Sequence, residues 1–336
     1  MKLKAWYVNL SLFILLLCGF LLALCIGKYP VTVPEALQII AGRLFGIQGD
    51  WPRMTENVIF GLRLPRILAS ICCGAALAIS GATYQSTFKN PLVSPDLLGV
   101  SSGACIGAAI AILMSLPFAY IQLFAFCGGL LAVFLTISIP YLMRSDSNIM
   151  LVLSGIIVGG LMSSMLGFLK YIADPTTKLA DITYWQMGSF SYVAIPSLLS
   201  VLPAMIISAV VLIALSWRLN ILSMGENEAK TLGANVTALR NICIVSATLL
   251  TASAVCLSGT IGWVGLVIPH LARMLTGPDN RKLLPAACIM GGLFLLLVDT
   301  VTRTVGTAEV PISILTGVIG APFYAWLLYR QRTKLK

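Results

Sequence analysis

The chain has 336 residues, of which 58% are hydrophobic and only 10% are charged, and its mean hydropathy is +0.95. A water-soluble domain of this length would carry about a quarter charged residues to cover its surface. The composition therefore excludes a soluble globular protein and predicts an all-α integral membrane protein. The net charge of +10 is not arranged as a basic stripe with interleaved aromatic residues. It favours cytoplasmic loops and lipid headgroups over nucleic acid as the partner.

Apolar runs predict about ten transmembrane helices in a single membrane domain over residues 1–336, since each is long enough to cross about 30 Å of hydrocarbon. The predicted spans are 6–26, 67–87, 97–115, 118–142, 149–169, 197–216, 241–261, 264–276, 283–299 and 311–329. The first run follows two lysines, as in a signal peptide, but its length and the spans after it favour a retained helix. The eighth is short and contains Pro269.

An even number of spans places both termini on one side, and their basic residues predict that this side is the cytoplasm. The predicted cytoplasmic loops are 88–96, 143–148, 217–240 and 277–282, and the external ones are 27–66, 170–196 and 300–310. The positive-inside bias leaves the basic residues of loop 27–66 unexplained. These residues are Lys28, Arg43, Arg53, Arg63 and Arg66.

A weak internal repeat appears at an offset of 178 residues. It aligns Ser80-Gly81 with Ser258-Gly259 and Pro91 with Pro269. The offset pairs the second span with the seventh, five spans later, so the two halves would have opposite orientations. Inverted repeats with segments broken by Gly and Pro are typical of transporter folds.

Several residues suggest other chemistry. Residues Gly99–Gly103 match G-x-S-x-G, which with His270 would indicate a serine hydrolase, but the motif opens an apolar helix rich in small residues, which favours helix packing. His270 is the lone histidine and is more often a packed residue than a metal ligand. The nine cysteines lie in apolar runs without metal-ligand spacing, so we interpret them as packing residues.

An ion-coupled secondary transporter is the main alternative, but it would need a buried relay of Asp, Glu or His. The carboxylates of this chain lie almost entirely at span ends. Asp299 and Arg303 are four residues apart at the end of the ninth span, which allows an ion pair on one helix face.

Two groups of motifs carry a more specific signal. The first is Arg63-Leu64-Pro65-Arg66, Gly74, Ser80-Gly81, Gln85, Asn90-Pro91-Leu92, Ser94-Pro95-Asp96, Leu98-Gly99 and Ser101-Ser102-Gly103. The second is Gly259, Pro269-His270, Arg273, Asp299, Arg303, Glu309-Val310-Pro311 and Gly320-Ala321-Pro322. In this order and spacing, over residues 60–328, they resemble the permeases of the vitamin B12 and iron–siderophore import family, the FecCD-type membrane subunits of type II ABC importers. Val310 departs from the leucine that is commoner in that family, which is a conservative change.

The resemblance implies a bacterial inner-membrane permease that forms a homodimer or one half of a closely related pair. It further implies two separate ATPase subunits and a periplasmic or lipid-anchored substrate-binding protein. The chain contains no G-x-x-x-x-G-K-[ST] loop, so ATP and Mg are expected on the ATPase, with no catalytic residue, metal or cofactor in this chain. The family's cargo includes ferric siderophores, haem, corrinoids and small metal oxyanions such as molybdate, and nothing in the sequence selects one of them.

By the same resemblance, segment 217–240 would contact the ATPase. Its acidic residues and closing glycine predict a short helix, and an ordinary connecting helix is the alternative. The proposed contact residues are Gly225, Glu226, Glu228, Ala229, Leu232 and Gly233.

A cytoplasmic gate is expected in the turns at Asn90, Pro91 and Leu92 and at Ser147 and Asn148, although a proline turn can be simple chain geometry. External docking of the binding protein is expected at Arg63, Arg66 and Arg303, since a guanidinium pairs with carboxylates through two hydrogen bonds. Snorkelling of these arginines to lipid headgroups is the alternative.

Overall fold

The computed structural model describes residues 5–46, 51–144, 147–231, 233, 235–306 and 308–332. Each predicted span contains a helix whose ends are shifted by a few residues at most. These helices are α1 (Ala5–Cys25), α4 (Leu64–Thr87), α5 (Val100–Leu113), α6 (Phe118–Leu142), α7 (Asn148–Ile172), α9 (Ile195–Ala214), α12 (Val236–Ser258), α13 (Val264–Thr276), α14 (Asn280–Thr302) and α15 (Ile312–Arg332). By length and composition, seven helical segments of the described chain can cross a membrane, while α5, α13 and α15 are shorter apolar helices.

The predicted loops contain further helices that the apolar pattern did not reveal. They are α2 (Val33–Phe45), α3 (Arg53–Asn57), α8 (Lys178–Met187), α10 (Ser216–Met224) and α11 (Glu226–Thr231). The start of α2 did carry a sequence signal. Thr32 accepts a hydrogen bond from the backbone of Glu35, and the Glu35 side chain accepts one from Thr32. This capping box satisfies helix N–H groups that would otherwise have no partner.

Residues 53–87 form one helical stretch in which α3 passes through a π-helical turn, Val58–Arg63, into α4. Pro65 lies at the start of α4 and has no N–H to donate, so the regular hydrogen-bond ladder cannot continue through it. In the preceding turn the N–H of Leu64 bonds to Ile59 O, five residues back, which is the wider π spacing.

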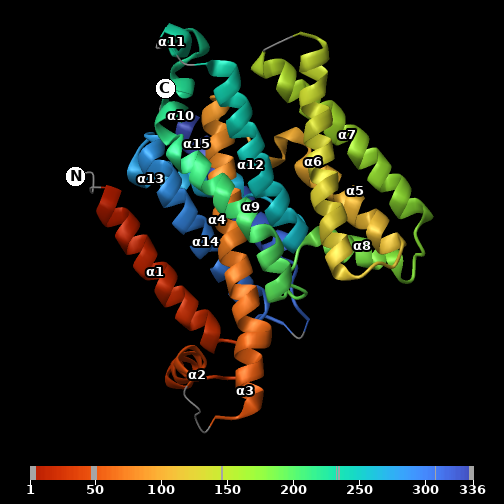
Figure 1. Ribbon diagram of the computed structural model, residues 1–336, viewed down its shortest axis with the longest axis vertical. Helices are drawn as coiled ribbons and strands as arrows, with labels where there is room; N and C mark the ends of the chain where they lie inside the picture. Colours follow the sequence, from red (N-terminus) through yellow and green to blue (C-terminus); the bar gives the residue numbers. More distant parts are fainter. Residues whose placement is uncertain are drawn as a thin grey trace.

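The helices pack around α4, which crosses the middle of the molecule (Figure 1). Helices α5 to α8 form a group on one side, and α1 lies on the other. Helix α11 and the described C-terminal end of the chain lie at one end of the molecule, which we call the α11 end. Helices α2 and α3 lie at the opposite end, which we call the α2 end. Helices α4 and α12 run in opposite directions, as the offset of the internal repeat requires, but Pro91 lies in a turn whereas Pro269 lies within α13.

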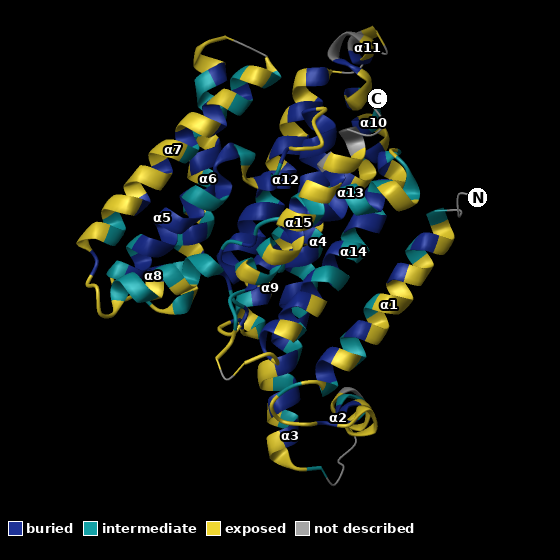
Figure 2. Cartoon of the chain, turned by 180° about the vertical axis from the view of Figure 1, so that it is seen from behind, coloured by how far each residue is buried: buried dark blue, intermediate teal, exposed yellow. Residues whose placement is uncertain are grey.

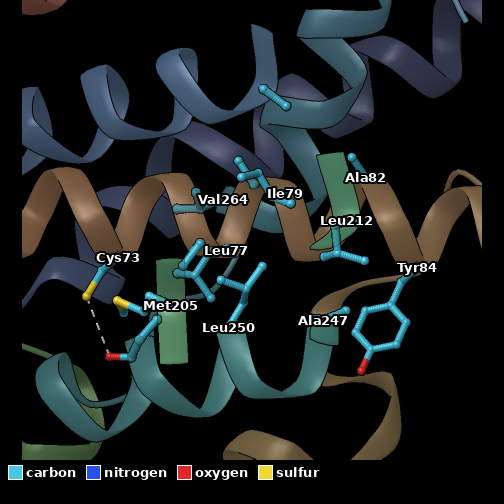
Figure 3. Packing of buried hydrophobic residues seen from close by; sticks show 14 of the residues in the cluster. Cys73, Leu77, Ile79, Ala82, Tyr84, Met205, Leu212, Ala247, Leu250 and Val264 are labelled. Carbon is cyan, nitrogen blue, oxygen red and sulfur yellow. Dashed lines mark hydrogen bonds between the residues drawn. The ribbon is translucent and has the colours of Figure 1, made fainter. Parts of the chain in front are cut away.

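Burial separates helices that face protein from helices that face lipid. Most of α4 and α12 is buried, whereas α1, α7 and α9 expose large apolar residues such as Leu15, Ile156 and Ile207 (Figure 2). In water such surfaces would aggregate, so they indicate contact with hydrocarbon. Figure 3 shows the central core, where Leu77 of α4 lies near Leu250 of α12. The thiol of Cys73 points to Ala254 O at 3.8 Å, and all nine cysteines are free.

Glycine lets α4 approach two other helices at backbone contact. A Cβ on Gly81 would lie 1.9 Å from Gly265 O of α13, and one on Gly74 would lie 2.2 Å from Gly291 O of α14. Because membrane helices gain little from excluding water, such close packing is a main source of their association.

We expect Gly81→Ala to separate α4 from α13 and to destabilise the fold by about 1–3 kcal/mol, the usual cost of overpacking. Gly160→Ala is the matched control, since nothing lies within 4 Å of the added carbon. Thermal denaturation in detergent, followed by size-exclusion chromatography, measures the difference. Equal stability of the two variants would contradict the close contact.

Candidate functional site

The α2 end contains a buried network of charges. Arg66 lies between two carboxylates: its Nε is 2.8 Å from Asp299 Oδ1 and its Nη1 is 2.8 Å from Glu309 Oε1. Arg303 lies 3.7 Å from Asp299 Oδ2, which confirms the predicted pair four residues apart. Asp299 is completely buried. Two arginines and two carboxylates therefore balance one another where α4, α14 and the segment before α15 meet.

Arg63 and Arg303 also hold the end of α1. Arg63 donates to the carbonyl oxygens of Leu24, Cys25 and Tyr29, and Arg303 Nη2 donates to Ala23 O at 2.8 Å. The last carbonyl groups of a helix have no partner within the helix, and cations near a helix C-terminus are favourable. The two arginines thus cap α1 and join it to α4 and α14.

These contacts bear on the expectation that the three arginines dock a binding protein, which stays a prediction. Arg63, Arg66 and Arg303 do not project from the outer face, because their exposed fractions are 5%, 8% and 8%. Their guanidinium groups are used inside the chain, so docking through them requires an exchange of partners. The sequence could not show this, since the carbonyl groups and Asp299 that bind them lie far away along the chain.

A cavity of about 700 Å³ lies beside the charge network. Aromatic side chains from α6, α8 and the following loop line it, together with Lys178 and Glu309; the aromatic residues are Phe118, Tyr184, Trp185 and Tyr192. Glu309 also accepts a hydrogen bond from Ser191. Burial alone would raise the pKa of Glu309, but the bonds from Ser191 and Arg66 outweigh it and lower that pKa. Glu309 therefore stays ionised at the cavity wall.

The first predicted gate turn follows α4. Asn90, Pro91 and Leu92 are all exposed, and Asn90 Oδ1 accepts the N–H of Leu92 at 2.9 Å. The hydroxyl of Tyr324 in α15 donates to Pro91 O at 3.1 Å. The turn is thus held by a side chain from a distant helix.

The second predicted gate turn precedes α7. Ser147 caps this helix by accepting the N–H of Ile149 at 3.3 Å, and Asn148 is its first residue. Asn148 Oδ1 has no hydrogen-bond partner within the described chain. Figure 1 shows the α6–α7 turn at the same end of the molecule as α11.

The predicted short helix in segment 217–240 is confirmed as α11, and α10 precedes it. Gly225 has a φ of 153° between the two helices, and Gly233 after α11 has a φ of 75°, a value that favours glycine. Glu228 is exposed and Ala229 is buried. Leu232 lies outside the described residues, and only the backbone of Glu226 is described.

Other candidate chemistry has little support in the described residues. Ser101 donates to Asp96, and a Cβ on Gly103 would lie 2.3 Å from Gly128 O, so this motif packs α5 against α6. His270 Nδ1 is buried and has no hydrogen-bond partner there. Within the described ranges, no group of three or more His, Cys, Asp or Glu residues could hold a metal ion.

Comparison with known proteins decides the family. The sequence profile of the FecCD transport family matches residues 15–330. The chain belongs to the FecCD transport family. The molybdate import system permease protein MolB of Haemophilus influenzae is 42% identical over 324 residues, which are 96% of this chain and 95% of MolB. A probable iron chelatin transport system permease protein of Helicobacter pylori is 39% identical over 275 residues, covering 82% and 83% of the two chains.

The fold of this FecCD permease also resembles a solved structure described as an inward-facing conformation of a metal-chelate type ABC transporter. The TM-score is 0.86 at 38% sequence identity, and the match covers 96% of this chain and 99% of the other. The chain is therefore a multi-pass permease of the ABC importer class, and the resemblance drawn from the motifs is confirmed.

For this FecCD permease we expect Arg66→Met to destabilise the fold by about 3–5 kcal/mol, because the change leaves Asp299 charged and buried with only a distant partner. Arg43→Met is the control, since the Arg43–Glu56 pair has side-chain exposures of 66% and 29% and such surface pairs contribute little. Thermal denaturation in detergent checks this. A loss for Arg66→Met no larger than that for the control would contradict the buried network.

Proposed function

We propose that this permease forms a homodimer in a bacterial inner membrane and imports a metal-containing solute with energy from two separate ATPase subunits. The observation that supports this best is α11, a short helix between α10 and α12 that lies at the α11 end, level with the α6–α7 turn (Figure 1). An exposed acidic residue, Glu228, and a glycine on each side, Gly225 and Gly233, suit it to fit a cleft on another protein.

We infer that the α11 end faces the cytoplasm and that the α2 end receives a periplasmic or lipid-anchored binding protein. The α11 end carries Lys89, Arg144, Arg218, Arg281 and Lys282. Their abundance fits the positive-inside bias. Of the arginines that oppose this orientation, Arg63 and Arg66 are buried and bonded inside the chain and add little exposed charge to the α2 end, whereas Arg43 and Arg53 are exposed there. Exposed residues around the cavity are better placed to meet a binding protein than the buried arginines are.

The cargo class rests on the relatives. Molybdate is named for the relative that is 42% identical, and iron chelatin for one that is 39% identical. We propose a metal oxyanion or a metal chelate as cargo, and the cavity of about 700 Å³ has room for either. Uptake of radiolabelled molybdate and ferric chelates into proteoliposomes, with the ATPase and the binding protein present, tests this. Uptake that needs an ion gradient but no ATP would instead support an ion-coupled secondary transporter.

We expect Glu228→Lys to weaken association with the ATPase subunit about tenfold or more, as reversal of a contact charge commonly does. The purified chain alone should hydrolyse no ATP. Co-purification and titration of the ATPase measure the effect, and Glu56→Lys at the α2 end is the control. Undiminished association of Glu228→Lys at low salt would exclude α11 as the contact.

We expect Ser147→Cys, in a chain without native cysteines, to form a disulfide between two copies of the permease. The reason is that a gate closed by two copies brings identical turns together on the dimer axis. Non-reducing electrophoresis after mild oxidation detects the product, and Leu199→Cys, exposed on α9, is the control. Absence of the product with and without nucleotide would show that this turn does not lie on the axis.

A further inference from the structure

Three polar side chains from three helices meet at the α11 end. Asn220 Oδ1 of α10 accepts hydrogen bonds from the backbone N of Asn280 at 2.8 Å and from its Nδ2 at 2.9 Å. Ser86 of α4 donates its hydroxyl to Asn280 Oδ1 at 2.8 Å. Asn280 and Ser86 are buried, with exposed fractions of 1% and 7%. A chain of hydrogen bonds therefore runs from α10 through the first residue of α14 to α4.

The direction of these bonds is fixed by a neighbouring carboxylate. Arg281 donates to Asp279 and is the main cause that lowers the pKa of Asp279 to about 2, so this group is ionised and can only accept. Asn220 Nδ2 donates to Asp279 Oδ1 at 2.7 Å, which leaves Asn220 Oδ1 for Asn280. The donor and the acceptor of each hydrogen bond in this network can therefore be assigned in one way. Breaking it would leave buried polar groups without hydrogen-bond partners, which is unfavourable.

The two ends of this network lie beside the two segments that an importer must connect. On one side, α10 ends at Met224, directly before Gly225 and α11. On the other side, Ser86 is one residue from the end of α4. The N–H of Asn90 bonds to Gln85 O at 3.1 Å, which ties the gate turn to this last helical turn.

Side chains of α13 and α15 also bond to the gate turn or to the last turn of α4 before it. Tyr324 of α15 donates to Pro91 O at 3.1 Å, and Arg273 of α13 donates to Gln85 Oε1 at 3.1 Å. Lys89, between these contacts, has a φ of 52°, a conformation that costs energy for a residue other than glycine. A displacement of α4 against α13 and α15 would therefore change the gate turn itself.

We propose that Asn220, Asn280 and Ser86 are positioning residues that transmit movement of the α10–α11 segment to the gate turn Asn90–Leu92. This inference rests on the proposed function, since it requires an ATPase at α11. Apolar side chains would fill the same space without the cost of burying amides. The amides instead provide a directional link between helices that are far apart in sequence.

The test uses the assembled importer, with permease, ATPase and binding protein. Leu92→Cys in a chain without native cysteines reports on the gate through its labelling rate with a membrane-impermeant maleimide, with and without ATP. Two variants break the link: Asn280→Leu keeps the side-chain size, and Ser86→Ala removes only the hydroxyl that joins α14 to α4. Ser223→Ala is the control, because the Ser223 hydroxyl donates to Asn220 O within its own helix and does not join two helices in the described structure.

We expect ATP to change the labelling rate about fivefold or more in the parent and in Ser223→Ala, the size of a typical coupling between sites. Asn280→Leu and Ser86→Ala should lose most of this change while they still bind the ATPase and hydrolyse ATP. The amount of solute transported per ATP hydrolysed should also fall in these two variants. Ser86→Ala keeps the bonds between α10 and α14, so it remains informative if Asn280→Leu does not fold.

Two results would overturn the inference in distinguishable ways. An unchanged ATP response of Leu92→Cys in Ser86→Ala, with full ATPase binding, would show that the link does not carry movement, although the proposed function would stand. Failure of the parent chain to bind any ATPase would instead overturn the proposed function. The inferred link between α10 and the gate turn would then also be wrong.

Discussion

The close contact of α4 with its neighbours is the constraint on which the rest of the structure depends. Gly81 and Gly74 let the backbone of α4 touch α13 and α14, and side-chain hydroxyl groups of α4 also reach a third helix, α12. Ser80 donates to Ala247 O at 2.9 Å, and the hydroxyl of Tyr84 lies 2.8 Å from that of Thr248. In hydrocarbon no water can satisfy these groups, so each must find a partner in the protein.

Each end of α4 contains polar or charged side chains that bond to other helices or loops. At the α2 end, Arg66 joins Asp299 and Glu309; at the α11 end, Ser86 meets Asn280. In the proposed orientation, α4 therefore connects the end of the molecule that would receive cargo with the end that would release it. This arrangement suits a permease, because transport requires the two ends to respond to each other.

The burial of three arginines also reduces the conflict between the basic residues of the α2 end and the proposed membrane orientation. Arg63, Arg66 and Arg303 would place excess positive charge on the external side if they were exposed. Inside the protein, carboxylates balance Arg66 and Arg303, and carbonyl groups at the end of α1 receive Arg63. These arginines therefore join the first helix to the rest of the bundle, a role that requires no external partner.

The sequence by itself determined the membrane class, the positions of the ten apolar helices, the FecCD resemblance and the short helix α11, because these depend on local composition, spacing and motif order. Only the tertiary structure decided which way the charged and polar side chains face. The Arg66–Asp299 and Ser86–Asn280 contacts join residues 233 and 194 positions apart. Such contacts form where helices cross, and no local pattern encodes where a crossing will bring two side chains together.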